Sequence, residues 1–149
     1  MRNVSPLATH IERLVRLMKV ETFTPDNVMK PIGPYSHIAK AGPFISISGT
    51  AGVDPTTGLL AGPDAYAQAR QILASFRTML ESVGSDMEQV MHIHVFLRNM
   101  DDFEEMNRAY REAFAGHLPA RTVVGVSALP RKDALLTMNL NAVVNETSG

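Results

Sequence analysis

Cysteine is absent from this chain of 149 residues. Without cysteine there is no disulfide bond, no thiolate nucleophile and no cysteine-ligated metal, and the composition fits a reducing compartment. The chain contains no apolar run close to the ~18 residues of a membrane span, and its N-terminus lacks the apolar core of a secretory signal. We therefore expect a cytoplasmic protein with no membrane as a partner.

Charge is scarce too, because Asp, Glu, Lys and Arg make up 19% of the chain and leave a net charge of −1. Soluble domains usually carry about 25% charged residues. No basic stripe is present, so we expect no nucleic acid as a partner. Fewer charges mean less surface that requires water, which indicates an oligomer that buries more than one face. The length suits one domain with a sizeable core.

The first 18 residues predict a helical extension of this domain. Ser5 suits the N-cap and Pro6 the first helical position. Apolar residues then recur at helical spacing, namely Leu7, Ile11, Leu14, Val15 and Met18. Because this stripe is short, it must pack against another surface. Met18 also resembles a second start of the protein, so an upstream start codon is the simplest account of residues 1–18. Residues 19–149 are assigned to a single domain.

The domain alternates strands and helices in an order typical of an α+β fold. Strands are expected at residues 20–23, 36–40, 44–49, 90–97, 122–126 and 135–144. One helix is expected from residue 65 to 83, with Asp64 as its cap and Gly84 after its end. A second helix follows Asp101 or Asp102 and closes at Gly116. This order predicts two helices covering one face of a mixed sheet.

Two short segments carry the candidate chemistry. Gly33-Pro34-Tyr35-Ser36 is a rigid turn with an aromatic hydroxyl, and Pro119-Ala120-Arg121-Thr122 places a lone arginine before an apolar run. An unpaired buried charge is costly, and a planar guanidinium binds a carboxylate through two parallel hydrogen bonds. We interpret Arg121 as a carboxylate receptor and Tyr35 as the wall beside it. The structural alternatives are an ion pair with a loop carboxylate for Arg121 and simple turn packing for Tyr35.

Further short motifs accompany these two in a fixed order: Ser48-Gly49, Asp54-Pro55 with Gly58, Val95-Phe96-Leu97, Met100-Asp101-Asp102-Phe103, Asn107 with Tyr110, and Ala128-Leu129-Pro130. As a set they resemble the Rid proteins, also called the YjgF/YER057c/UK114 family, over residues 18 to 145. The resemblance implies homotrimers with a chorismate-mutase-like fold, in which the sheets line a central barrel and ligand pockets lie between subunits. It also implies hydrolysis of small enamines or imines to a keto acid and ammonia, without a metal or other cofactor.

The resemblance assigns roles to individual residues. Arg121 corresponds to the arginine that binds the substrate carboxylate, and Tyr35 to the tyrosine that lines the site. Ser48 corresponds to the serine at the end of the third strand, beside Gly49. Val123 replaces a family cysteine whose backbone amide is the group used. Asn107 follows the family pattern, and we expect it to bond nearby backbone, as we do for the Ser48 hydroxyl.

One family residue is missing, namely the glutamate on the last strand that orients the attacking water. Thr137 stands at that position, and neither Thr137 nor the next same-face residue, Asn139, can act as a carboxylate base. Asp133 is the nearest acid but precedes the strand in a loop. General base catalysis contributes roughly 10²–10⁴-fold, so we expect a weakened deaminase in which Thr137 holds the water. A non-catalytic carboxylate-binding trimer is the alternative, and ribonuclease activity ranks last.

His92 and His94 lie two residues apart on one strand, a spacing that occurs in metal sites. Two histidines without a third ligand make a weak metal site. A polar face of the sheet is the better interpretation, and no metal is expected.

Overall fold

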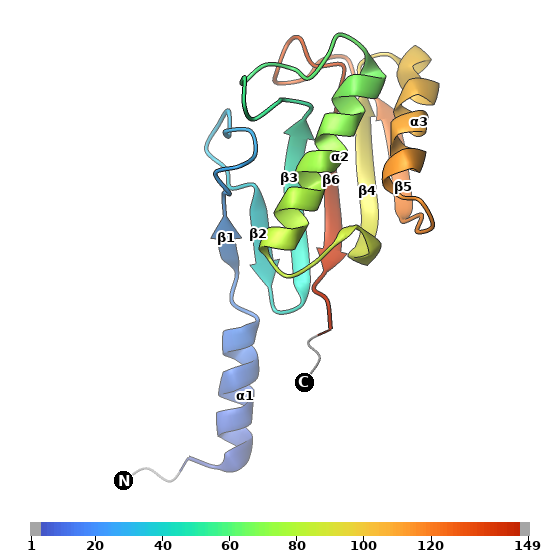
Figure 1. Ribbon diagram of the computed structural model, residues 1–149. Coiled ribbons are helices and arrows are strands. Elements are labelled where there is room, and N and C mark those ends of the chain that lie inside the picture. The colour runs from blue at the N-terminus through green and yellow to red at the C-terminus, as the bar shows by residue number, and fades with distance from the viewer. Residues whose placement is uncertain (1–3, 147–149) are drawn as a thin grey trace.

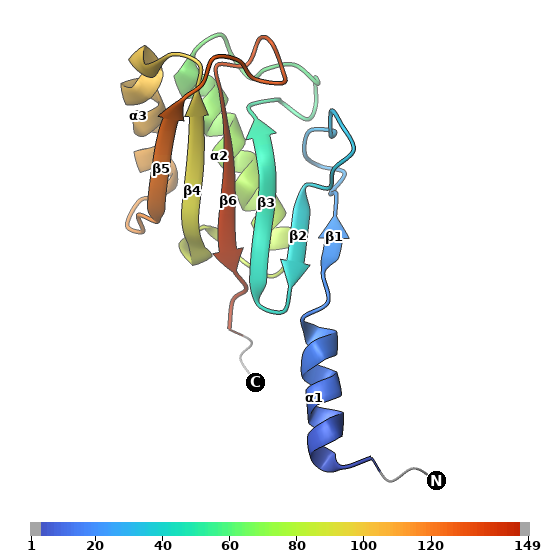
Figure 2. The ribbon, with the colours of Figure 1, turned by 180° about the vertical axis from the view of Figure 1, so that it is seen from behind.

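The computed structural model describes residues 4–146. Residues 1–3 of the predicted extension and 147–149 of the predicted domain lie outside the described residues. Two helices, α2 (Ala65–Ser82) and α3 (Phe103–Ala113), pack side by side on one face of a sheet, as Figure 1 shows. The opposite face of the sheet carries no helix in the described part of the chain, and Figure 2 shows it from behind.

The sheet has six strands in the order β1-β2-β3-β6-β4-β5. They are β1 (Glu21–Phe23), β2 (Ile38–Ala41), β3 (Phe44–Ala51), β4 (Val90–Leu97), β5 (Ala120–Gly125) and β6 (Leu136–Val143). All neighbours are antiparallel except β4 and β5, which run parallel. Parallel neighbours need a crossover connection, and α3 supplies it here. The predicted α+β fold with a mixed sheet and helices on one face is therefore confirmed.

The core lies between the sheet and the two helices. Alternate residues of the central strands, such as Ile93 and Val95 in β4, are fully buried, as are Ile72 and Phe76 of α2. Strand side chains alternate between faces while helical ones recur every three or four residues, so the two patterns meet in one apolar layer. The strand residues between the buried ones point to the opposite face of the sheet, which carries no helix in the described part of the chain.

Capping chemistry sets the ends of α2 as predicted. The Asp64 carboxylate accepts a hydrogen bond from the amide of Ala67 at 2.8 Å, and Gly84 follows the helix with a φ of 79°. The prediction for α3 is wrong in one respect, since Asp102 is its N-cap residue but makes no capping hydrogen bond with its side chain. Asn99 instead caps a short 3-10 turn that leads into α3.

The N-terminal helix α1 (Pro6–Leu17) projects away from the sheet (Figure 1). The Ser5 hydroxyl accepts a hydrogen bond from the amide of Ala8 at 3.1 Å, so the predicted cap is present. None of the α1 residues is buried, and its apolar stripe therefore finds no covering surface within the chain. Among the helices of the described residues, none is both long and apolar enough to reach across a bilayer.

A close approach between β3 and α2 depends on Gly52, just after the strand. A methyl group on Gly52 would overlap the backbone oxygen of Gln68 and lie 2.7 Å from its Cα. Both atoms belong to the backbone of α2 and cannot rotate away. Helix α2 can approach the sheet this closely only because residue 52 has no side chain.

We expect Gly52→Ala to lower the free energy of unfolding by about 1–3 kcal/mol, the usual cost of overpacking. Urea denaturation measures it. Gly49→Ala is the matched control, because nothing lies within 4 Å of its added methyl group. A change below ~1 kcal/mol is expected there. Equal effects of the two substitutions would contradict the close approach.

Candidate functional site

Four of the predicted site residues line one pocket of about 200 Å³. Tyr35 comes from the turn before β2, Ser48 and Gly49 from β3, and Thr137 from β6. Strands β3 and β6 are direct neighbours, with Ala51 opposite Thr137. Their register shifts between Ile47 and Thr50, so Ser48 and Gly49 lie where the regular ladder is interrupted. Sheet pairing thus gathers residues from three separate segments.

Tyr35 is fixed by its own turn. Its amide donates to the carbonyl of Gly33 at 2.9 Å, and its hydroxyl accepts from the amide of Ile32 at 3.3 Å. The ring meets the buried His37 ring edge to face, with 5.9 Å between centroids. Tyr35 therefore packs within its turn, as one interpretation of the sequence had it, and it also lines the pocket.

The Ser48 hydroxyl donates to the carbonyl of Ser36 at 2.7 Å, which is the backbone bond expected from the sequence. Its amide donates to the carbonyl of His37 at 2.9 Å. The hydroxyl proton is therefore committed, and what Ser48 can offer a ligand is its oxygen as an acceptor. This pair of bonds also ties the Tyr35 turn to β3.

Arg121 lies elsewhere, under α3 and on the helical side of the edge strand β5. One terminal nitrogen donates to the amide oxygen of Asn107 at 2.8 Å. The guanidinium carbon lies 4.8 Å from the centroid of the Tyr110 ring and 5.7 Å from that of Phe103. The expectation that Asn107 bonds backbone is wrong, since its oxygen accepts from Arg121 and its nitrogen donates to Glu104 at 3.4 Å.

The charge of Arg121 is therefore held by neutral groups. Among the described residues the ion pair present is Arg131 with Asp133, so no carboxylate within 4 Å neutralises Arg121. A structural ion pair was the main alternative for this arginine, and the described residues do not form one. A half-buried guanidinium that retains its charge is suited to receive an anion.

Tyr110 completes the surroundings of Arg121. Burial raises the pKa of its hydroxyl to about 12, although the positive charge of Arg121 opposes this rise. The hydroxyl has no hydrogen-bond partner among the described residues. Tyr110 therefore remains protonated at neutral pH and offers Arg121 the face of a neutral ring.

The two halves of the predicted site do not meet within one chain. Arg121 and Val123 alternate with exposed residues of β5, whereas the pocket lies at β3 and β6. Strand β4 stands between β6 and β5. Thr137 also faces away from the helices, between the buried Leu136 and Met138, while Arg121 packs against α3. Tyr35 is thus not beside Arg121 within one chain, which corrects the interpretation of Tyr35 as the wall beside the arginine.

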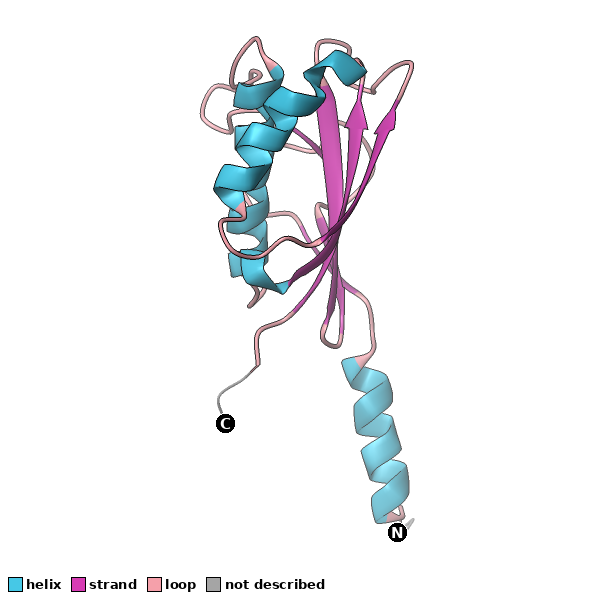
Figure 3. Ribbon diagram, turned by 90° about the vertical axis from the view of Figure 1, so that its right-hand side faces the viewer, coloured by secondary structure: helices cyan, strands magenta, loops and turns pink. Residues whose placement is uncertain are grey.

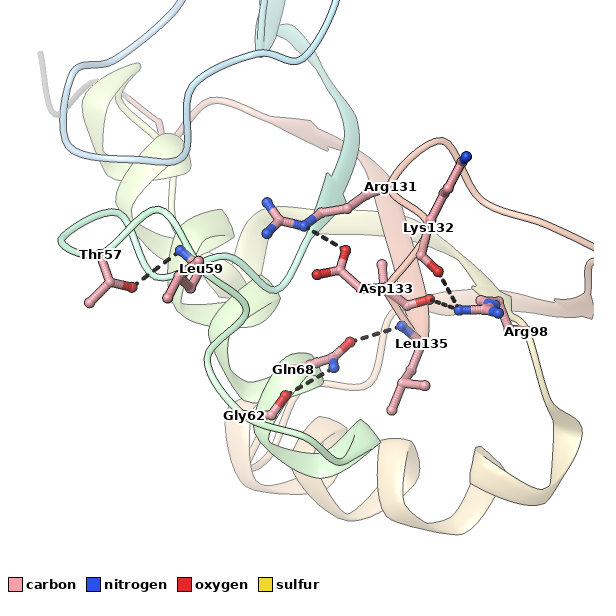
Figure 4. Close-up of polar contacts among 10 residues, drawn as sticks. Thr57, Leu59, Gly62, Gln68, Arg98, Arg131, Lys132, Asp133 and Leu135 are labelled. Atoms are coloured by element: carbon pink, nitrogen blue, oxygen red, sulfur yellow. Dashed lines mark hydrogen bonds and ion pairs between the residues drawn. The ribbon is translucent and has the colours of Figure 1, made fainter.

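Five further residues line the pocket that sequence reasoning missed: Met29, Ile32, Ala51, Pro130 and Arg131. Most are apolar and come from loops, so no periodic pattern marks them. The Nε of Arg131 donates to the Asp133 carboxylate at 3.0 Å, and Figure 4 shows its terminal nitrogens pointing away from that contact. Asp133 is not in the pocket lining and does not replace the missing glutamate.

Gln68 of α2 holds the loop that carries Pro130 and Arg131. Its side-chain nitrogen donates to the carbonyl of Gly62 at 3.0 Å, and its oxygen accepts from the amide of Leu135 at 2.9 Å (Figure 4). Arg98 secures the same loop through the carbonyl of Lys132 at 2.6 Å. The helical layer thus fixes one wall of a pocket that opens on the other side of the sheet.

His92 and His94 form part of the open sheet face, as the sequence indicated. Their rings stack at 4.4 Å, His92 bonds the Thr122 hydroxyl, and His94 bonds the Asn139 side chain at 2.9 Å. Across residues 4–146, no three potential metal ligands gather in one place.

Comparison with known proteins places these features among relatives. Residues 25–144 match the family described as Endoribonuclease L-PSP. A RutC family protein from Pyrococcus horikoshii is 44% identical over 119 residues, which cover 80% of this chain and 93% of that protein. A protein of Mus musculus named 2-iminobutanoate/2-iminopropanoate deaminase is 39% identical over 100 residues, covering 67% of this chain and 74% of its own.

Solved structures agree. The YjgF gene product from E. coli superposes with a TM-score of 0.78 at 32% identity, covering 84% of this chain and 99% of that one. A structure described as a putative endoribonuclease L-PSP from Entamoeba histolytica gives a TM-score of 0.80 at 30% identity, covering 85% and 100%. The matched family residues begin at residue 25, so α1 lies outside the matched range.

We expect Gln68→Ala to lower the free energy of unfolding by about 1–3 kcal/mol, because two backbone groups lose their partner in a partly buried place. Urea denaturation measures the loss. Gln71→Ala on the same helix is the control, since it removes only a bond to the Ser75 side chain and costs a few tenths of a kcal/mol. Equal losses would show that Gln68 does not anchor the loop.

Proposed function

Since the chain belongs to the endoribonuclease L-PSP family, which includes the Rid proteins, we propose that it is a deaminase acting without a cofactor on a small, carboxylate-bearing enamine or imine. Water would replace nitrogen at the imine carbon, giving a carbonyl compound and ammonia. The observation that carries this proposal is the guanidinium of Arg121, which is held in place by Asn107 and aromatic rings yet has no counter-ion within the described residues.

Arg121 would bind the substrate carboxylate. Asn107 occupies one of its terminal nitrogens, and the guanidinium keeps further N–H donors for a forked contact with two carboxylate oxygens. The amide of Val123, on the same edge strand, would supply a second donor. Because α3 fixes the arginine before the ligand arrives, little of the binding free energy is lost in ordering it.

We propose that the site forms between copies of the chain in a homotrimer. One copy would contribute Arg121 and Val123, and its neighbour the pocket of Tyr35, Ser48, Gly49 and Thr137. Support comes from the separation of these two groups within one chain, and from the general preference of ligand pockets for interfaces.

In the reaction, water adds to the carbon of the protonated imine and gives a carbinolamine. The C–N bond then breaks, nitrogen leaves as ammonia, and the carbonyl group forms. The Thr137 hydroxyl can hold the attacking water by a hydrogen bond but cannot accept its proton at neutral pH. The proton must pass to solvent, so positioning rather than general base catalysis would account for the rate.

A second candidate is a binder of small carboxylates that does not turn them over. The observation that favours it is Thr137 itself, which leaves the pocket lining without a carboxylate. Titration with 2-oxobutanoate separates the two, since binding without turnover indicates the binder. RNA cleavage ranks last, because the chain has a net charge of −1 and no basic stripe to attract phosphates.

The deaminase proposal predicts opposite effects at two positions. Arg121→Gln should lower kcat/KM for 2-iminobutanoate, generated in situ, by about 10²-fold or more, because charge-assisted hydrogen bonds to the carboxylate are lost. Thr137→Glu should raise kcat by about 10²-fold, since a general base contributes roughly 10²–10⁴-fold. The measurement is keto acid release above the rate in buffer alone.

Each change has a matched control. Arg77→Gln removes a charge from the outer groove between α2 and α3, and Asn139→Glu adds a carboxylate on the same strand face outside the pocket lining. Both should leave the rate unchanged. The deaminase proposal is rejected if neither the natural chain nor Thr137→Glu exceeds buffer, and the binder is rejected as well if 2-oxobutanoate does not bind.

The shared site predicts complementation between two inactive variants. Gly49→Leu would fill the pocket from a position with open space around its Cβ, while Arg121→Gln removes the receptor. When the two are co-expressed, some boundaries combine an intact pocket with an intact arginine, so activity should return. Separately purified variants, assayed each alone, are the control. If co-expression restores nothing, the two residues do not act across a boundary.

A further inference from the structure

The N-terminal helix α1 lies at the opposite end of the sheet from the pocket. The pocket lies at the C-terminal end of β3 and the N-terminal end of β6. Figure 1 shows these strand ends uppermost, and α1 extends beyond the other end of the sheet. Figure 3 shows α1 displaced toward the open face of the sheet, away from α2 and α3. None of its residues lines the pocket, so α1 does not cover the site of its own chain.

Apolar residues of α1, together with its C-cap residue Met18, follow the spacing of a coiled-coil seam. Leu7, Ile11, Leu14 and Met18 succeed one another at intervals of four, three and four residues. That alternation marks positions d and a of a heptad, which face a partner helix. Each of the four is at least 48% exposed, so the described residues of the chain do not cover the seam, although the sulfur of Met18 lies beside Gly42.

The positions that flank the seam carry no carboxylate, lysine or arginine. Ala8 and Val15 lie on one side, and His10 and Leu17 on the other. In a parallel bundle of identical helices these flanks face each other, and like charges there would repel. Glu12, Arg13 and Arg16 all fall on the outer positions instead. This distribution suits a copy of the same helix better than a charged partner.

We infer that α1 binds α1 of another copy in a short parallel bundle, joined through the seam of Leu7, Ile11, Leu14 and Met18. A helix of 12 residues is too short to hold such a bundle by itself. The assembly of domains put forward under the proposed function would keep the helices at high local concentration, and the tethering step rests on that assembly. A closed cyclic oligomer places all its α1 helices at one end, so the bundle is parallel.

The absence of cysteine makes a cross-linking test clean, since one introduced thiol can react only with its copy in another chain. In a parallel bundle Ile11→Cys brings two thiols together across the seam. Arg16→Cys on the same helix is the control, because residue 16 lies on the outer side. Under mild oxidation of the full chain, we expect Ile11→Cys to form disulfide-linked dimers at least ten times faster than Arg16→Cys.

Equal cross-linking rates for Ile11→Cys and Arg16→Cys would overturn the inference. A mixture of Leu7→Cys and Leu14→Cys chains tests the direction of the helices. Disulfides that form only between the two different variants would indicate antiparallel helices and would also overturn it. As an independent measure, Leu14→Asp should lower the temperature at which the oligomer dissociates, while Arg13→Asp should not. An unchanged temperature for Leu14→Asp contradicts the bundle. Keto acid release by reduced Ile11→Cys reports on the deaminase separately, so either idea can fail alone.

Discussion

The organisation of this protein depends on how the charge of Arg121 is accommodated. Its guanidinium bonds the neutral oxygen of Asn107 and lies against two aromatic rings, and no carboxylate of the described residues lies within 4 Å of it. These contacts fix its position but leave the charge uncompensated. Burying such a charge further is costly unless an anion arrives with it. Under the proposed function, this guanidinium is a carboxylate receptor that is ordered before the ligand arrives.

The parallel pairing of β4 and β5 places this receptor under a helix. An antiparallel hairpin would join the two strands by a short turn, whereas the crossover through α3 lays that helix over β5. Asn107 and Tyr110 then come from the face of α3 that is turned toward the sheet. The same pairing leaves β5 as an edge strand, and exposed edges readily meet other chains. Arg121 and an exposed edge of the sheet therefore belong to the same strand.

The sequence predicted what depends on neighbours along the chain. The cap at Asp64 and the positive φ at Gly84 arise from local chemistry, so the limits of α2 were predicted almost to the residue. Asn107 was misread because its partner lies 14 residues away, and no local pattern reports that contact. The separation of Tyr35 from Arg121 was not foreseen either. It follows from the order and pairing of the strands, which a single sequence does not encode visibly.

The charge of Arg121, which has no counter-ion within 4 Å in the described residues, and the uncovered apolar face of α1 are different physical signals, and each of the two proposals assigns its missing partner to another copy of the chain. The two features differ in how much free energy they can contribute to an assembly. Full burial of an aliphatic side chain contributes about 1.5–3 kcal/mol, and the α1 seam offers four such residues, each only partly buried in a bundle. Ordering a short helix consumes much of that gain. In the assembly proposed above, the domain, which has the larger surface, would therefore establish the contact between copies, and α1 would add to its stability.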